Sequence, residues 1–306
     1  MSLAGNQMLH RTSSKVRWIG TIQVLLSAFF FGCMSIFVKI AYGQGIDPLT
    51  LLTFRFVLAA VVLWVYFSIF EARFLRCSFR QLLLLGAFGI LYGIMSTLLF
   101  MSLERIPASL AIMIFYTHPA LITLLAWIFY KEPLSSSRGI AVLLTLSGCA
   151  FILQVSFETL DWTSGTFLAL GTSISYAVYL TWGQKVLKKM SPQTLVLYVV
   201  TFLAILFSIV HNPFAVLAAG AFSFKGWLAV LAIAVFSTCL AILLLFSGIE
   251  KIGAARASLI STFEPLSAVL MAYFFLNETL TFPQLWGGGL ILLGIMVIEW
   301  PRKAEG

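Results

Sequence analysis

Two ionisable residues occupy matching places in long apolar runs of this sequence. His118 comes directly before Pro119, and Glu264 directly before Pro265, each near the middle of its run. A proline leaves the carbonyl four residues earlier without its helical partner, so we expect a kink at both places. Polar groups at membrane depth are energetically costly and often functional. We predict that one or both of these side chains bind a substrate ammonium or carry a proton; the alternative is a hydrogen bond that only packs helices.

Further candidates recur at helical spacing in six of the apolar runs. A pocket for a small amphipathic solute needs aromatic walls and a few hydroxyls. For any single residue the competing interpretation is ordinary helix packing, but the stripes together favour a lining role. The predicted substrate-binding residues are Ser27, Phe31, Tyr92, Ser96, Tyr116, His118, Tyr176, Tyr179, Thr238, Ser258 and Glu264.

Four other charges are interpreted as structural. Lys39 and Arg55 lie within or near the ends of apolar runs on one side. Snorkelling to the interface or a salt bridge explains them, with Asp47 as one partner for Arg55, although Arg55 could instead meet an anionic group of a substrate. Glu132 and Glu278 follow two runs, where a carboxylate can accept N–H groups at the start of the next helix.

The composition excludes most classes of protein. The chain has 306 residues, of which 61% are hydrophobic and 10% charged, and its mean hydropathy is +1.03. Soluble chains are about 45–50% apolar and about 25% charged. A soluble enzyme, a nucleic-acid binder, a disordered chain and a disulfide scaffold are therefore excluded, and an integral membrane protein remains. The net charge of +8 is interpreted as an orientation signal.

No motif predicts a cofactor. The four cysteines are far apart, with no spacing suited to a metal, and no phosphate-binding loop or nucleophile elbow is present. An intramembrane enzyme would need a paired nucleophile and base, which is not visible. A receptor would need a sizeable soluble domain or long loops. We therefore predict neither an enzyme nor ATP-driven transport.

Ten continuous apolar runs of about 20 residues predict ten transmembrane helices. Short alternating segments, typical of membrane β-barrels, are not seen. The polar ends, 1–17 and 301–306, are predicted tails, and the first run is interpreted as retained because no cleavage site follows it. The predicted helices are 18–42, 48–70, 80–103, 107–130, 136–155, 162–184, 192–211, 224–248, 254–276 and 282–300.

Loop charges give the orientation. Of the 19 Lys and Arg residues, fifteen fall on one side, three on the other (Lys39, Arg105 and Lys225), and Arg55 lies within a run. Cytoplasmic loops carry the excess of positive charge. Both termini are therefore predicted in the cytoplasm, with the protein in the cytoplasmic membrane. Only an even number of crossings gives this result.

The chain also repeats itself. With a shift of 146, Glu104–Gln154 aligns on Glu250–Trp300 without a gap. We predict two repeats, 18–155 and 156–300, with five helices each. Because five is odd, the second repeat enters the membrane from the opposite side. Inverted repeats are typical of secondary transporters, which bind substrate near the midplane and alternate access between the two sides.

Several short motifs, read together, resemble a known family. They are Ser27–Lys39, Phe54-Arg55-Phe56, Lys131-Glu132-Pro133-Leu134, Asn277-Glu278-Thr279-Leu280 and the segments around Pro119 and Pro265. The layout resembles the drug/metabolite transporter superfamily, specifically its EamA type, over essentially the whole chain. The resemblance implies an all-α membrane fold of two inverted five-helix repeats and export of amino acids, related metabolites or drugs.

We therefore predict an exporter of amino acids or related small metabolites that works by alternating access. The alternative is proton-coupled efflux of drugs or cations. The expected partners are the lipid bilayer and a small solute, with no nucleic acid. The oligomeric state stays open at this stage.

Overall fold

The computed structural model describes residues 14–132, 135–155, 163–214, 223–276 and 279–300, and within these ranges all regular structure is helical. Glu278 lies outside the described residues. The first half contains α1 (Ser14–Gly43), α2 (Pro48–Phe70), the 3-10 turn η2 (Ala72–Leu75), α3 (Phe79–Leu103), α4 (Ala108–Phe115), α5 (His118–Tyr130) and α6 (Ser136–Leu153).

The second half repeats this order. It contains α7 (Ser164–Val186), α8 (Pro192–Val210), α10 (Phe224–Ala234), the π-helix η4 (Val235–Leu240), α11 (Ala241–Ile252), α12 (Ala254–Ser261), α13 (Phe263–Leu276) and α14 (Phe282–Glu299). The pairs α4–α5 and α12–α13 each form one interrupted span, and α10, η4 and α11 form one continuous span. The described helices therefore confirm ten crossings close to the predicted bounds.

Matching caps start the second helix of each half. The Asp47 carboxylate accepts the N–H groups of Leu49 and Thr50, both at 3.0 Å, and Ser191 accepts the N–H of Thr194 at 3.2 Å. A proline follows each cap, at a position where a missing N–H costs little. Desolvation opposes ionisation of Asp47, but the hydrogen bonds from Thr50 and Leu49 outweigh it and lower the pKa of the carboxyl.

Nine helical spans in the described part of the chain are long and apolar enough to cross a membrane. The remaining crossing, α7, has 23 residues but carries more hydroxyls than the others. Its polar side chains Thr166, Thr172 and Ser173 are buried. Such a helix can bury its polar face against neighbouring helices and expose its apolar face, and Phe167 and Ile174 of α7 are indeed exposed. The protein is thus a multi-pass membrane protein in which the hydroxyls of α7 face other helices.

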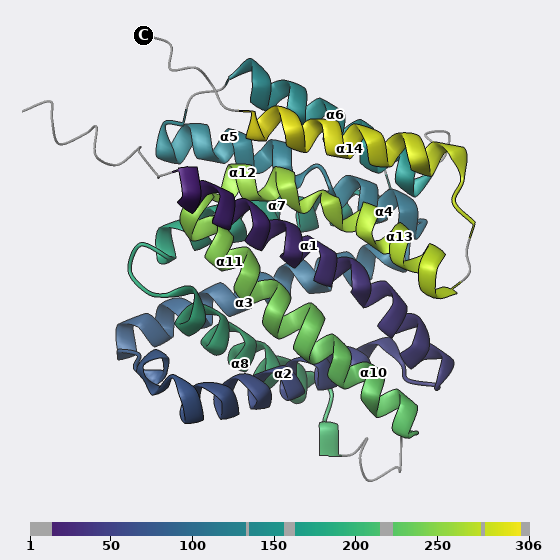
Figure 1. Cartoon of the computed structure of the whole chain (residues 1–306). Helices are drawn as coiled ribbons and strands as arrows, with labels where there is room; N and C mark the ends of the chain where they lie inside the picture. The colour runs from purple at the N-terminus through teal and green to yellow at the C-terminus, as the bar shows by residue number, and fades with distance from the viewer. Residues whose placement is uncertain (1–13, 133–134, 156–162, 215–222, 277–278, 301–306) are drawn as a thin grey trace, which may run out of the picture.

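The helices form a bundle with two distinct edges. In Figure 1, α6 and α14 lie side by side along one edge, and α2 and α8 along the opposite edge. A Cβ atom added at Gly148 would lie 2.6 Å from the Gly287 carbonyl oxygen, so α6 and α14 touch backbone to backbone. The other six crossings fill the space between these two pairs.

The packing inside the bundle follows the internal repeat. Helix α1 packs against α11 and α13, and α7, the equivalent of α1, packs against α3 and α5. A Cβ atom at Gly20 would lie 2.7 Å from Ile252, and one at Gly165 would lie 2.7 Å from Ile106. These glycines and their partners are matched by the sequence repeat. Each repeat therefore places its first helix against the third helix of the other.

Polar contacts join helix ends at both faces. At one face, the Arg17 guanidinium contacts the Glu299 carboxylate at 3.1 Å, which brings the start of α1 next to the end of α14. At the other face, Ser223 donates to the Gln44 side chain at 2.7 Å. The start of the first helix and the end of the last helix therefore lie at the same face of the bundle, as an even number of crossings requires.

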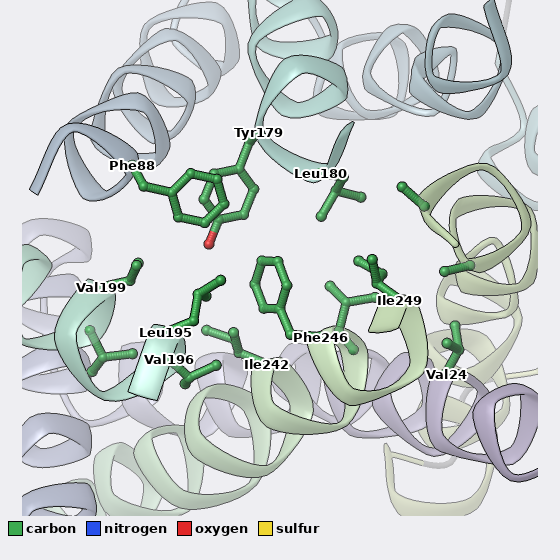
Figure 2. Packing of buried hydrophobic residues seen from close by; sticks show 14 of the residues in the cluster. Val24, Phe88, Tyr179, Leu180, Leu195, Val196, Val199, Ile242, Phe246 and Ile249 are labelled. Carbon is green, nitrogen blue, oxygen red and sulfur yellow. The ribbon is translucent and has the colours of Figure 1, made fainter. Parts of the chain in front are cut away.

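The largest apolar core joins both repeats. Figure 2 shows Phe88 of α3 and Tyr179 of α7 facing Leu195 of α8 and Phe246 of α11. The rings of Phe88 and Tyr179 stack with centroids 4.2 Å apart. This packing fixes the inner helices that carry the polar residues described next.

Candidate solute-binding site

Both interrupted spans break immediately before their prolines. Helix α4 ends at Phe115 and α5 begins at His118, while α12 ends at Ser261 and α13 begins at Phe263. The predicted kinks are therefore present as breaks between helices. In each case the proline cannot donate a backbone hydrogen bond, and the preceding carbonyls lose regular helical partners. These breaks place His118 and Glu264 between the repeats.

The hydrogen bond at Nδ1 determines the tautomer of His118. Its Nδ1 lies 2.8 Å from the Phe115 carbonyl oxygen, which is the carbonyl released by Pro119. A carbonyl only accepts, so Nδ1 carries the proton and Nε2 of the neutral ring is an acceptor. Nε2 is buried, and none of the described residues donates to it. His118 therefore presents a fixed acceptor that the protein leaves unfilled.

Aromatic rings surround this histidine. The His118 ring lies 4.7 Å from that of Phe115, 4.8 Å from that of Tyr176 and 5.9 Å from that of Tyr116, between centroids. Tyr176 continues to Tyr179 at 6.2 Å. The sequence-predicted tyrosines are thus brought together with His118 in one array on α4, α5 and α7.

Tyr179 and Tyr92 lie at the far end of that array. Their ring centroids are 5.3 Å apart, and Figure 2 shows the Tyr179 hydroxyl directed into the apolar core near Phe246. This hydroxyl has no hydrogen-bond partner in the described part of the chain. Tyr179 therefore contributes more to the packing of α3, α7 and α11 than the sequence interpretation assumed.

Glu264 lies on the other side of Tyr116 and Tyr176. The Tyr116 hydroxyl is within hydrogen-bonding reach of its carboxylate, and Arg55, Tyr176 and Cys149 are close enough to interact with it electrostatically. Glu264 is half-buried. It belongs to none of the ion pairs found among the described residues. This carboxylate therefore faces the interior without a cation in contact.

Arg55 of α2 is the cation that interacts electrostatically with Glu264. Its Nε donates to the Thr238 hydroxyl at 2.7 Å, and its Nη2 donates to the Ser237 carbonyl at 3.3 Å. Both partners belong to η4, and π-helical segments are frequent at functional sites. Arg55 is only 9% exposed, and no carboxylate in the described ranges lies within 4.0 Å of it. Asp47, considered as its partner from the sequence, instead caps α2.

We call Arg55, Tyr116, His118, Tyr176 and Glu264 the central cluster. It combines a buried cation, a carboxylate and a neutral acceptor, separated by two tyrosine rings. Its side chains come from α2, the break between α4 and α5, α5, α7 and α13, so both halves of the chain contribute. The sequence favoured a structural role for Arg55 and left contact with an anionic group of a substrate as the alternative; an arginine within an apolar run is itself a signal for function.

The other predicted binding residues lie outside this cluster. Ser27 donates to the Ala241 carbonyl at 2.7 Å, and Ser258 donates to the Ala255 carbonyl at 2.9 Å. The Thr238 hydroxyl accepts the hydrogen bond from Arg55 Nε. Phe31 packs against the main apolar core, and Ser96 is buried. The structure therefore brings only part of the predicted lining together.

Two of the remaining charges lie nearer the ends of the helices. Lys39 lines a cavity of about 270 Å³ between α1, α13 and the start of α14, together with Ser35 and Gln284. Glu132 forms an ion pair with Arg138 at 2.7 Å, which ties the end of α5 to α6. Neither Lys39 nor Glu132 belongs to the central cluster.

Comparison with known proteins places the chain in a family. The sequence model of the EamA-like transporter family matches residues 18–154 and again residues 163–300. The chain belongs to the EamA-like transporter family. Its two EamA-like matches together cover nearly all of the described residues, and the fold of two five-helix repeats is the fold of the family.

Curated relatives of this EamA-like protein include transporters from several organisms. An uncharacterized transporter of Synechocystis sp. is 27% identical over 327 residues, which covers 95% of this chain and 96% of the relative. An uncharacterized transporter of Archaeoglobus fulgidus is 26% identical, covering 92% and 99%. The threonine/homoserine exporter RhtA of Escherichia coli is 26% identical, covering 79% and 78%.

A solved crystal structure has the same fold. It superposes with a TM-score of 0.76 at 17% sequence identity and covers 92% of this chain and 96% of the other. At this identity the similarity concerns the fold alone.

Proposed function

We propose that this protein exports small zwitterions, amino acids or close relatives, across the cytoplasmic membrane. The carboxylate of the solute would bind Arg55, and its ammonium would bind Glu264. Two repeats, which we propose to span residues 18–155 and 156–300, would rock around this site to open it to each side in turn. Both termini would then lie in the cytoplasm.

The observation that carries this proposal is the pair of opposite charges in the central cluster. Arg55 and Glu264 interact electrostatically, yet neither forms an ion pair within 4.0 Å among the described residues. Charges taken out of water need a partner, and a zwitterion supplies one to each. Its two charged ends would form charge-assisted hydrogen bonds, which are stronger than neutral ones.

The tyrosines support the same solute class. Tyr116 and Tyr176 lie between Glu264 and the His118 ring, where their faces can contact a small aliphatic or cationic group. Small-solute sites typically combine apolar walls with a few placed polar groups. The name of the Escherichia coli relative, a threonine/homoserine exporter, is consistent with an amino acid as the solute.

Counterflow tests the proposal directly. Purified protein is reconstituted in liposomes preloaded with an unlabelled amino acid, and uptake of the radiolabelled amino acid is followed. We expect uptake above that of liposomes that lack the protein. We expect this uptake to be abolished when the unlabelled amino acid is not preloaded. Absence of counterflow for a panel of neutral amino acids, with folded protein in the liposomes, would contradict the proposal.

Proton-coupled efflux of cations is the second candidate. It is favoured by the Glu264 carboxylate, which has no cation in contact within the described part of the chain and lies beside two tyrosines. A cationic drug would use Glu264 but not Arg55. If Arg55→Gln leaves drug efflux intact while Glu264→Gln removes it, this candidate replaces the first.

A further inference from the structure

The Nε2 atom of His118 is a polar atom that the proposed charge pair does not use. Its role as acceptor follows from Nδ1, which the Phe115 carbonyl holds at 2.8 Å. His118 is 2% exposed, and Nε2 has no donor among the described residues. A buried acceptor without a donor costs free energy, so its retention in the centre of the protein needs an explanation.

Three of the neighbouring hydroxyls, those of Thr117, Ser173 and Tyr116, already have partners. Thr117 donates to the Ile114 carbonyl at 2.7 Å, so the Ser173 hydroxyl, 2.9 Å away, donates to Thr117. The Tyr116 hydroxyl reaches the Glu264 carboxylate. None of the described residues donates to Nε2, which leaves this acceptor open to a donor from a bound solute.

The position of Nε2 relative to the charge pair indicates which part of a solute it meets. Tyr116 contacts His118 with its ring, and its hydroxyl lies within hydrogen-bonding reach of Glu264. Tyr176 contacts His118 with its ring and interacts electrostatically with Glu264. His118 is therefore one aromatic ring away from the carboxylate. An amino acid with its ammonium at Glu264 would extend its side chain toward the imidazole.

We propose that His118 Nε2 accepts a hydrogen bond from the side chain of the solute and makes the protein selective for zwitterions with a side-chain hydroxyl or amide donor. This inference rests on the proposed function, because it assumes that Arg55 and Glu264 hold the two charged ends. His118 is then a specificity-determining residue. A solute without a donor leaves Nε2 unfilled in the complex, which lowers its transport relative to an isosteric solute that has one.

Three solutes of similar shape test the direction of the hydrogen bond. Threonine and valine differ by a hydroxyl in place of a methyl, and O-methylthreonine keeps the oxygen but cannot donate. In competition counterflow with the wild-type protein, we expect threonine to be preferred over both others by at least about 10-fold. Equal transport of threonine and O-methylthreonine would overturn the inference, because Nε2 would then not act as an acceptor.

Two substitutions separate the two nitrogens of the ring. In His118→Asn the amide can still donate to the Phe115 carbonyl but has no counterpart of Nε2, whereas in His118→Gln the longer amide restores an acceptor near Nε2. We expect His118→Asn to bring the threonine-to-valine ratio close to 1 while valine is still transported. We expect His118→Gln to retain most of the ratio.

Thr123→Val is the matched control. Thr123 lies on the same helix, and its hydroxyl already donates to the Pro119 carbonyl at 2.8 Å, so its removal should leave the ratio unchanged. A His118→Asn protein that keeps the wild-type ratio, or that loses both solutes equally while unfolding at the wild-type temperature, would overturn the inference. The solute series decides the question if a variant does not fold. A wild-type protein that transports no amino acid contradicts the proposed function instead.

Discussion

In the α4–α5 span the residue before the proline is His118, whereas in the α12–α13 span it is Glu264. The two breaks are equivalent in the repeat, but their chemistry differs. His118 uses one nitrogen to satisfy the carbonyl that Pro119 releases, and its other nitrogen has no partner among the described residues. Glu264 instead lies within hydrogen-bonding reach of the Tyr116 hydroxyl, which belongs to the other repeat, and it interacts electrostatically with Arg55.

This difference shows how an inverted repeat can make an asymmetric site. The same backbone break supplies a neutral acceptor in one repeat and a charge in the other. A symmetric pair of carboxylates would repel each other, and a symmetric pair of imidazoles would provide no charge for an ammonium.

Loss of the Arg55 charge should have the largest effect. In Arg55→Gln the hydrogen bond to Thr238 can remain, but the buried cation is removed. Hydrogen bonds to charged groups contribute about 1.5–3 kcal/mol, so kcat/KM for a neutral amino acid should fall by about 10-fold to 100-fold. Proteoliposome counterflow measures this loss. Arg105→Gln, at an exposed end of α3, is the control, and equal activities of the two variants would argue against Arg55 as a solute contact.

Glu264→Gln should lower transport somewhat less, because Tyr116 can still hydrogen-bond to the amide. We expect about a 10-fold loss and, in addition, a changed pH profile. Wild-type counterflow should fall as the pH is lowered, since protonation removes the carboxylate charge that holds the ammonium, whereas Glu264→Gln should be flat. Glu264→Asp should restore part of the wild-type slope. If Glu264→Gln kept the pH dependence of wild-type counterflow, a group other than Glu264 would be responsible for that pH dependence.

The packing symmetry of the repeats predicts equal destabilisation at two glycines. Gly20→Ala and Gly165→Ala each place a methyl group 2.7 Å from an isoleucine of the other repeat, and each should lower the free energy of unfolding by about 1–3 kcal/mol. Gly139→Ala is the control, because nothing lies within 4 Å of its Cβ position. Thermal unfolding in detergent would measure all three. A large difference between the destabilisation caused by Gly20→Ala and that caused by Gly165→Ala would contradict symmetric packing of the two repeats.

The matched caps of α2 and α8 predict the smallest effect. Asp47→Ala and Ser191→Ala should each cost about 1 kcal/mol of stability at neutral pH. Hydrogen bonds lower the pKa of Asp47 in the folded protein, so its contribution is present at neutral pH and is lost as the pH falls through that pKa. Unfolding at pH 7 and pH 3 should therefore show a smaller Asp47→Ala effect at pH 3, but no such change for Ser191→Ala.

The positions of the spans and of the breaks could be predicted from the sequence. Continuous apolar runs and the prolines at 119 and 265 contain that information, because they act locally on the helix. The π-helix η4 could not be predicted in this way. Its extra residue fits Ser237 and Thr238 to Arg55 on a helix far away in the sequence, so it depends on tertiary contacts.

The same distinction applies to the candidate site. Sequence patterns identified Tyr116, His118, Tyr176 and Glu264, which lie together in the central cluster. They did not separate these residues from Ser27 and Ser258, whose hydroxyls are used by carbonyls of their own or neighbouring helices. Helical spacing reveals which face of a helix a residue is on. It does not reveal whether the hydrogen-bonding group of that residue already has a partner in its own helix or in another one.

In the proposed site, Arg55 and Glu264 hold the two ends of one zwitterion. Competition counterflow tests this arrangement with three solutes: threonine, the amine that lacks its carboxylate, and the hydroxy acid that lacks its ammonium. We predict that the wild-type protein prefers threonine over both, that Arg55→Gln loses discrimination against the amine only, and that Glu264→Gln loses discrimination against the hydroxy acid only. Loss of both preferences together in each variant, or two unchanged preferences, would contradict a site in which Arg55 and Glu264 bind opposite ends of the solute.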